Sequence, residues 1–185
     1  MSKKPIIVFE GIEGTGKSHH IKKVVKYLKN NNKKFIYIRE PGGSINSEKI
    51  RKLILNNKST FNEHTDLLLY LSARSENIKL IEKNIGKSII LIDRFSDSTI
   101  AYQHYGMGVN LKFINNINDY LLKNINIDFT FLNIVDQKNM KERLMNRKNL
   151  NRYDKFNSNF YERVQKGFLK ILKSNPKRYM KIDSN

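Results

Sequence analysis

Short apolar runs alternate with longer stretches of helical periodicity along the whole chain. The apolar runs have the length of strands and lie near residues 5–10, 34–39, 88–93, 128–135 and 178–183. Between them, apolar residues recur with helical spacing at about 17–30, 45–56, 62–84, 111–124, 136–148 and 157–173. This alternation predicts an α/β fold, in which a five-stranded, mostly parallel sheet carries helices on both faces and binding sites gather at the carboxyl ends of the strands.

Length and composition narrow the class of protein. A chain of 185 residues fits a single domain spanning 1–185. It contains no cysteine, so neither a disulfide nor a thiolate metal site can form. The apolar runs are too short to cross a membrane, and the start at Met1-Ser2-Lys3-Lys4 lacks the apolar stretch of a signal peptide. We therefore expect a cytoplasmic protein with no membrane partner.

The charge of the chain is strongly positive. A formal net charge of +18 is typical of nucleic-acid-binding proteins, because basic surfaces bind phosphate backbones. However, pairs such as Lys22-Lys23 and Lys33-Lys34 fall on or beside predicted helix surfaces, where solvated charge is the usual explanation. We do not expect nucleic acid to be the main partner, although the positive field should attract anionic nucleotides. The histidines show no metal-ligand spacing and are assigned no chemistry.

The stretch from Gly11 to Ser18 has the pattern of a phosphate-binding loop. It reads Gly, four residues, Gly, Lys, Ser, and it lies between the first apolar strand and the first helical stretch. In such a loop the backbone N–H groups surround phosphate oxygens, the lysine reaches the β and γ phosphates, and the serine hydroxyl binds Mg²⁺. The alternative is a glycine-rich turn with an incidental lysine. The residues predicted to bind ATP in the loop are Gly11, Gly14, Thr15, Gly16, Lys17 and Ser18.

Polar residues also follow the other strands. Asp93 ends the third strand, where P-loop enzymes place an acidic residue that holds Mg²⁺ directly or through water, and it could instead cap the next helical turn. Arg94 offers a planar fork for a second phosphate, or a structural ion pair. Tyr70 and Arg74 lie four residues apart on one helix face, where they could bind a base or belong to the core.

Three arginines lie near the end of the sixth helical stretch. Arg143 and Arg147 stand four residues apart, and Arg152 follows in a polar segment. Phosphoryl transfer concentrates negative charge, so a segment at about 143–156 that delivers these arginines would serve as a lid. The alternative is that they are ordinary surface charges.

Three segments together resemble the thymidylate kinase family. They are Phe9 to Ser18, Arg39-Glu40-Pro41-Gly42-Gly43, and the run from Asp93 to Gln103, of which the last is the most specific. The resemblance extends from Pro5 to about Asp183. It implies a three-layer P-loop kinase fold, binding of ATP and Mg²⁺, and transfer of the γ-phosphoryl group to dTMP, which gives dTDP and ADP for dTTP synthesis. It also implies a homodimer.

The resemblance further implies roles for matched residues. Arg94 and Arg51 would lie near the dTMP phosphate, Tyr70 would stack on thymine, and Arg74 would bond its O4 side. Tyr102 would lie near the sugar 2′ position and Gln103 toward the base. Glu13 would contact the 3′-hydroxyl region, and Glu40, Pro41 and Ser98 complete the dTMP site.

The lid matches the bacterial subtype, in which the P-loop lacks an arginine and the lid supplies it. Arg143 would face ATP, and Arg147 or Arg152 would stabilise the transition state. With Lys17, Arg94 and Glu13, these last two form the predicted catalytic set.

Two departures from the family pattern stand out. Ser72-Ala73-Arg74 replaces the more usual Ala-Asp-Arg, which affects the hydrogen bonding expected of Arg74. The family usually continues into a further helix after the strand near 178–183. Its contacts would here be replaced by a subunit interface or another surface, or the product would be less stable.

Two other functions are considered. One is a kinase of another pyrimidine nucleotide or of a deoxynucleoside. The other is a P-loop nucleotide-binding protein with a basic nucleic-acid surface, which would bind DNA or RNA with a steep salt dependence and show no acceptor-dependent ATP turnover.

Overall fold

A computed structural model describes residues 4–148 and 150–185. Residues 1–3 and residue 149 lie outside the described residues. Residues 1–3 belong to the start at which the sequence predicts no signal peptide, and residue 149 belongs to the predicted lid. The elements in chain order are β1 (Ile6–Glu10), α1 (Lys17–Asn30), β2 (Phe35–Arg39), α2 (Ile45–Leu55), α3 (Glu63–Asn84), β3 (Ile89–Asp93), α4 (Ser96–Thr99), the π-helix η1 (Ile100–Gly106), α5 (Leu111–Leu122), β4 (Phe129–Ile134), α6 (Gln137–Met145), the short 3-10 helix η2 (Tyr153–Lys155), α7 (Ser158–Ser174), η3 (Pro176–Arg178) and β5 (Tyr179–Asp183).

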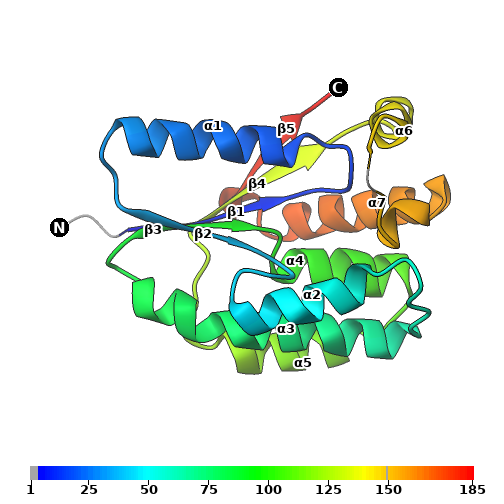
Figure 1. The fold of residues 1–185 in the computed structure, drawn as a ribbon, viewed down its shortest axis with the longest axis horizontal. Coiled ribbons are helices and arrows are strands. Elements are labelled where there is room, and N and C mark those ends of the chain that lie inside the picture. Colours follow the sequence, from blue (N-terminus) through cyan, green and yellow to red (C-terminus); the bar gives the residue numbers. More distant parts are fainter. Residues whose placement is uncertain (1–3, 149) are drawn as a thin grey trace.

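The five strands form one sheet in the order β2-β3-β1-β4-β5. All four strand pairings are parallel, with Phe9 beside Asp93 in one of them and Arg39 beside Asp93 in another. Figure 1 shows the sheet between α1 on one side and α2, α3 and α5 on the other. The predicted fold class is confirmed, and the predicted strands and helices are present. The carboxyl ends of the strands meet at one edge, as parallel pairing requires.

Alternate strand residues feed separate cores on the two faces of the sheet. Phe9 and Leu91 pack against Ile21 and Leu28 of α1. Their neighbours Val8, Ile90 and Ile92 point to the other face, where they pack against Ile81 of α3. A further cluster surrounds Leu132 and joins η1, α6 and α7. The edge of the sheet that carries the polar residues is therefore held by packing on both sides.

The pattern missed the helical segment formed by α4 and η1. Ser96-Asp97-Ser98-Thr99 shows no apolar periodicity, yet all four residues are buried. The backbone N–H groups of Phe95 and Ser98 donate to the buried Glu10 carboxylate. The segment is also fixed by close approach to α7, since a Cβ on Gly167 would lie 2.5 Å from the Tyr105 ring. Tertiary contacts, rather than local pattern, make this segment helical.

Side chains cap the starts of several helices. Asp136, which follows β4, accepts a hydrogen bond from the Asn139 N–H and caps α6. Asn62 caps α3 and Asn157 caps α7 in the same way. Asp136 thus has a local structural role.

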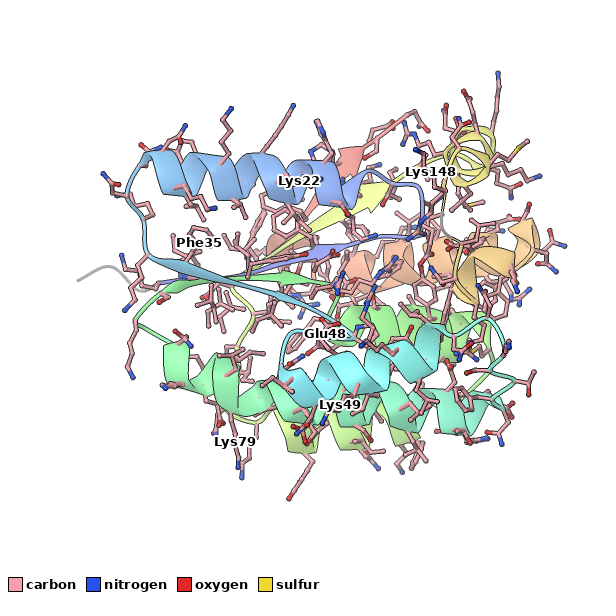
Figure 2. All side chains as sticks on the ribbon, in the orientation of Figure 1. Lys22, Phe35, Glu48, Lys49, Lys79 and Lys148 are labelled. Atoms are coloured by element: carbon pink, nitrogen blue, oxygen red, sulfur yellow. The ribbon has the colours of Figure 1, made fainter. Side chains whose placement is uncertain are left out.

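Positive charge is spread over several elements. Figure 2 labels Lys22 on α1, Lys49 on α2 and Lys79 on α3, and all three side chains are exposed. Lys23, Lys33 and Lys34 are exposed as well, as the sequence predicted. Among the described residues, no helix is long and apolar enough to cross a membrane.

Candidate active site

The phosphate-binding loop leaves β1 and enters α1 through glycines that no other residue could replace without strain. Gly11 has a φ of +133°, and a Cβ there would lie 2.2 Å from the Asn133 carbonyl oxygen. Gly14 has a φ of +73° and lies against the Met140 backbone. The loop therefore fits closely beneath the end of β4 and the start of α6.

Lys17 folds back over this loop. Its Nζ donates to the carbonyl oxygens of Gly11 at 2.9 Å and Ile12 at 3.1 Å. Burial and the charge of Arg94 lower the pKa of Lys17 to about 8, against the opposing effect of Asp93 and Glu13. An anionic ligand at this position would favour the charged lysine.

A cleft of about 360 Å³ opens above the loop. It is lined by six cationic side chains, which favours an oligophosphate ligand: Lys17, Arg39, Arg51, Arg94, Arg143 and Arg147. The predicted site residues that line it are Glu13, Gly14, Thr15, Gly16, Lys17, Ser18, Glu40, Pro41, Arg51, Tyr70, Asp93, Arg94, Arg143 and Arg147.

Arg94 lies between the phosphate-binding loop and a second, smaller pocket. It adopts a φ of +66°, and its Nη1 donates to the Gly11 carbonyl at 2.8 Å while Nη2 donates to Glu13 at 2.9 Å. Burial opposes its charge, but Tyr102 and Glu13 raise the pKa of Arg94. Burial likewise opposes ionisation of Glu13, whose pKa is nevertheless lowered by Arg94 and Lys17. Arg94 is thus a fixed cation at the boundary of the cleft.

Glu10 binds the backbone of the segment that follows Arg94. Its carboxylate is fully buried and accepts hydrogen bonds from the Phe95 N–H at 2.8 Å, the Ser98 N–H at 3.2 Å and the Ser98 hydroxyl at 2.5 Å. Burial and Asp97 raise its pKa to about 7, against the lowering effect of the Ser98 bond and Arg94. Sequence reasoning gave Glu10 no role, although an acidic residue at the end of a buried strand was a signal.

A second, smaller pocket of about 30 Å³ adjoins the cleft and shares Glu13, Tyr70, Arg94 and Tyr153 with it. Its other lining residues are Ser98, Tyr102 and Gln103. The Tyr102 hydroxyl donates to Glu13. Most residues predicted for the acceptor nucleotide therefore meet here. Tyr153, which the sequence reasoning missed, is 2% exposed and reaches this pocket from the lid.

Arg74 differs from its predicted placement and does not line either pocket. It is only 2% exposed, and its Nε donates to Glu40 at 2.9 Å. Nη1 donates to Asn118 at 2.8 Å and Nη2 to Thr99 at 2.9 Å. A buried guanidinium needs a counter-charge, and Glu40 supplies it. The structure therefore places Arg74 in an ion pair with Glu40 behind the two pockets rather than on their walls.

The three lid arginines have different environments. Arg143 donates to the Gly14 carbonyl at 2.8 Å, and Arg147 pairs with Asp154 at 2.7 Å while lining the cleft. Arg152 does not line the cleft, and its guanidinium is bound instead to Asp66 and the Ile54 carbonyl. Of the two predicted transition-state arginines, the structure brings only Arg147 to the cleft.

Two remaining predictions concern loop and phosphate contacts. Gly11 itself does not line the cleft, because its carbonyl oxygen is covered by Lys17 and Arg94. Arg51 lines it and donates to the Pro41 carbonyl at 2.6 Å.

Asp93 and Ser18 offer oxygen ligands next to Lys17. Among the described residues, Oδ1 of Asp93 is buried without a hydrogen-bond partner, and Oδ2 accepts a long bond of 3.4 Å from Tyr37. Within the described ranges there is no group of three His, Cys, Asp or Glu residues that could hold a metal. Carboxylate and hydroxyl oxygens that leave most positions to phosphate and water fit Mg²⁺.

An all-parallel sheet with a phosphate loop after its first strand and a cation-lined cleft over that loop defines a P-loop nucleotide phosphotransferase. Comparison with known proteins narrows this class. The sequence profile of thymidylate kinase matches residues 9–185. The chain belongs to the thymidylate kinase family.

Individual relatives agree with that assignment. Thymidylate kinase of Thermosipho africanus is 39% identical over 90% of this chain and 84% of the relative, and that of Mycoplasma capricolum is 37% identical over 97% and 86%. Among solved structures, thymidylate kinase from Ehrlichia chaffeensis superposes with a TM-score of 0.79 at 32% identity, covering 100% of this chain and 90% of that one.

Proposed function

We infer that this protein phosphorylates dTMP to dTDP with ATP as the phosphoryl donor. The single observation that carries this inference is that the side chains of Lys17 and Arg94 both donate to the same backbone carbonyl oxygen. Lys17 Nζ lies 2.9 Å and Arg94 Nη1 lies 2.8 Å from the Gly11 carbonyl. Lys17 belongs to the donor loop and Arg94 lines the acceptor pocket, so the phosphates they bind would be adjacent.

This placement suits transfer between two phosphates. An oxygen of the dTMP phosphate forms a bond to the γ-phosphorus of ATP while the bond to the β-bridging oxygen breaks, which leaves ADP and dTDP. The transition state is loose and spreads charge over the transferred group, so alignment and charge neutralisation supply most of the acceleration. We assign these tasks to Lys17, Arg94 and Arg147, and we assign no general base.

Ser18 and Asp93 would hold Mg²⁺ at the donor phosphates. When bound, the ion supplies charge neutralisation on the β and γ oxygens. The unpartnered Asp93 oxygen supports this proposal.

The thymidine part of dTMP would lie where the cleft adjoins the small pocket, because the pocket alone, at about 30 Å³, is smaller than a nucleoside. Tyr70 offers a ring for stacking, Tyr102 and Glu13 would face the sugar, and Ser98 and Gln103 line the remaining wall. Glu40, Pro41 and Arg51 line the cleft on the acceptor side. Arg74 would act through Glu40 rather than by touching the base.

Arg143 would contact ATP, because its side chain already binds the Gly14 carbonyl of the phosphate loop. Arg147 is the lid arginine proposed to face the transferred group. Arg152 could take part directly only after leaving Asp66, so we propose that it acts mainly by holding the lid. Homodimer formation and cytoplasmic residence remain predictions.

An acceptor panel tests the function. ADP release is measured with ATP, Mg²⁺ and one acceptor at a time: dTMP, dUMP, UMP, CMP or thymidine. We expect the highest kcat/KM for dTMP and little turnover with the ribonucleotides. Preference for another acceptor would assign a different pyrimidine kinase. Salt-sensitive DNA or RNA binding without acceptor-dependent turnover would assign a nucleic-acid-binding module.

A further inference from the structure

The end of the lid is bound to the helices of the acceptor side. The Asn57 side chain, just after α2, donates to the Leu150 carbonyl at 2.9 Å. Arg152 donates through its backbone N–H to the Leu55 carbonyl at 3.4 Å and through Nε to the Ile54 carbonyl at 3.0 Å. The lid residues 150–152 therefore rest on the carboxyl end of α2, although about 90 residues of chain separate them.

One buried carboxylate gathers the contacts next to this junction. Asp66, in the first turns of α3, is 1% exposed and accepts hydrogen bonds from Arg152 Nη2 and the Tyr153 hydroxyl. It also accepts one from Gln103 Nε2 at 3.2 Å, and the same Gln103 atom lies 3.3 Å from the Tyr153 hydroxyl. Two of the three donors belong to the lid, and the third lines the acceptor pocket.

Asp154, the residue after Tyr153, connects the contacts of Asp66 with the phosphate cleft. The Asp154 side chain has no exposed surface and binds Arg147 Nη1 at 2.7 Å through one oxygen. Its other oxygen accepts the Asn151 N–H at 2.8 Å. Arg147 lines the phosphate cleft. Fixing residues 152 and 153 therefore also fixes the carboxylate that aims Arg147.

We propose that Asp66 is a positioning residue of the reaction, which holds the lid through Arg152 and Tyr153 and so keeps Arg147 over the phosphates. This inference rests on the proposed function. The inference adds a link between the lid and the acceptor pocket, because Gln103 binds the same carboxylate and lines that pocket.

The chemistry requires a carboxylate at position 66. An ionised carboxylate only accepts, and here it receives three donors, one of them the charged Arg152. An asparagine of the same shape turns a donor toward one of those partners and removes the counter-charge of Arg152. Arg152 is 13% exposed, so it can move into water once released. Removing one partner of a buried ion pair is costly while the other charge stays buried. The expected result is therefore local opening of the lid, which takes Arg152 into water, rather than collapse of the core.

Limited proteolysis tests the lid contact without any substrate. The lid carries tryptic sites at Arg147, Lys148, Arg152 and Lys155. We expect Asp66→Asn to raise the cleavage rate at these sites by roughly tenfold, with a nearly unchanged unfolding midpoint. The matched control is Glu82→Gln, which makes the same change from carboxylate to amide near the other end of α3, at an exposed side chain that binds Asn124. Wild-type cleavage rates in Asp66→Asn, or an equal rise in the control, would overturn the proposal.

Kinetics supply a second measurement. In Asp66→Asn we expect kcat to fall about tenfold or more while KM for dTMP changes by only about twofold to threefold, because Tyr70, Arg94 and Tyr102 remain in place. Tyr153→Phe removes one donor only and should give a smaller rise in cleavage and a smaller fall in kcat, which keeps the test available if Asp66→Asn does not fold. An unchanged Tyr153→Phe would then contradict the proposal. Absence of turnover in the wild type would refute the proposed function, whereas the proteolysis result would still decide the lid contact.

Discussion

At the scale of single residues, the buried carboxylate of Glu10 sets a pH dependence of stability. Its pKa is about 7 in the folded protein against an ordinary value of 4.5. Between these values the folded state binds a proton that the unfolded chain does not, so the free energy of unfolding falls as pH rises through this window. Across the whole window, the free energy of unfolding falls by about 3 kcal/mol.

Glu10→Gln removes this dependence. The amide oxygen can accept from the Phe95 and Ser98 N–H groups while the NH₂ donates to the Ser98 hydroxyl, so the variant should fold. We expect it to gain stability relative to wild type between pH 5 and pH 8, measured by urea unfolding at both values. The comparison between variants cancels the titration of other groups. An identical difference at the two pH values would show that Glu10 does not titrate there.

Arg94 is the residue on which transfer should depend most. Arg94→Ala removes the cation that binds both the Gly11 carbonyl and Glu13. The variant should fold, because Lys17 and Tyr102 still face Glu13, but kcat should fall by about 100-fold to 1,000-fold. A steady-state assay at saturating dTMP measures the loss. Arg163→Ala, which removes an arginine bound to the Gly106 carbonyl outside the cleft, is the control, and near-wild-type turnover of Arg94→Ala would exclude the assigned role.

Residue types alone could not place every charged group. Loop residues 14–18 and Arg94 line the cleft because their positions directly after strands fix their geometry. Site roles were also predicted for Arg74 and Arg152. Their ion pairs with Glu40 and Asp66 hold the two guanidinium groups away from the pockets. Those partners lie 34 and 86 positions away in sequence, so no local pattern reports the pairing.

At the scale of elements, the close contact between η1 and α7 can be probed by a single substitution. A Cβ on Gly167 would lie 2.5 to 2.8 Å from three atoms of Tyr105. Alanine in a helix interior is worth about 1 kcal/mol over glycine. Overpacking against a ring costs about 1–3 kcal/mol, so the clash should win.

Gly167→Ala should therefore lower the free energy of unfolding, as measured in urea. Asn159→Ala, at an exposed position on the same helix, is the matched control and should change stability little. Because η1 carries Tyr102 and Gln103, the variant should also raise KM for dTMP. A more stable Gly167→Ala would mean that helix propensity outweighs the contact.

At the scale of the whole molecule, the family resemblance predicts a homodimer. Leu53 on α2 and Leu68 on α3 are large apolar side chains, 47% and 50% exposed, on helices at the outside of the fold. Burying them would favour association. Light scattering at micromolar concentration should give the mass of two chains. The mass of a single chain over the whole concentration range would contradict the dimer.

The sequence by itself determined the order of strands and helices, the parallel sheet and the donor loop, because apolar periodicity and glycine spacing are local properties that act over a few residues. It also placed Asp93 and Arg94 at the active edge, since parallel strands bring their carboxyl ends together. Only the tertiary structure decided that residues 96–106 are helical, that Tyr153 enters the acceptor pocket, and that Glu10 and Asp66 act as buried acceptors. Each of these depends on a donor or a packing surface supplied by a distant segment, and burial makes such partners decisive because an unpaired charge inside a protein is costly.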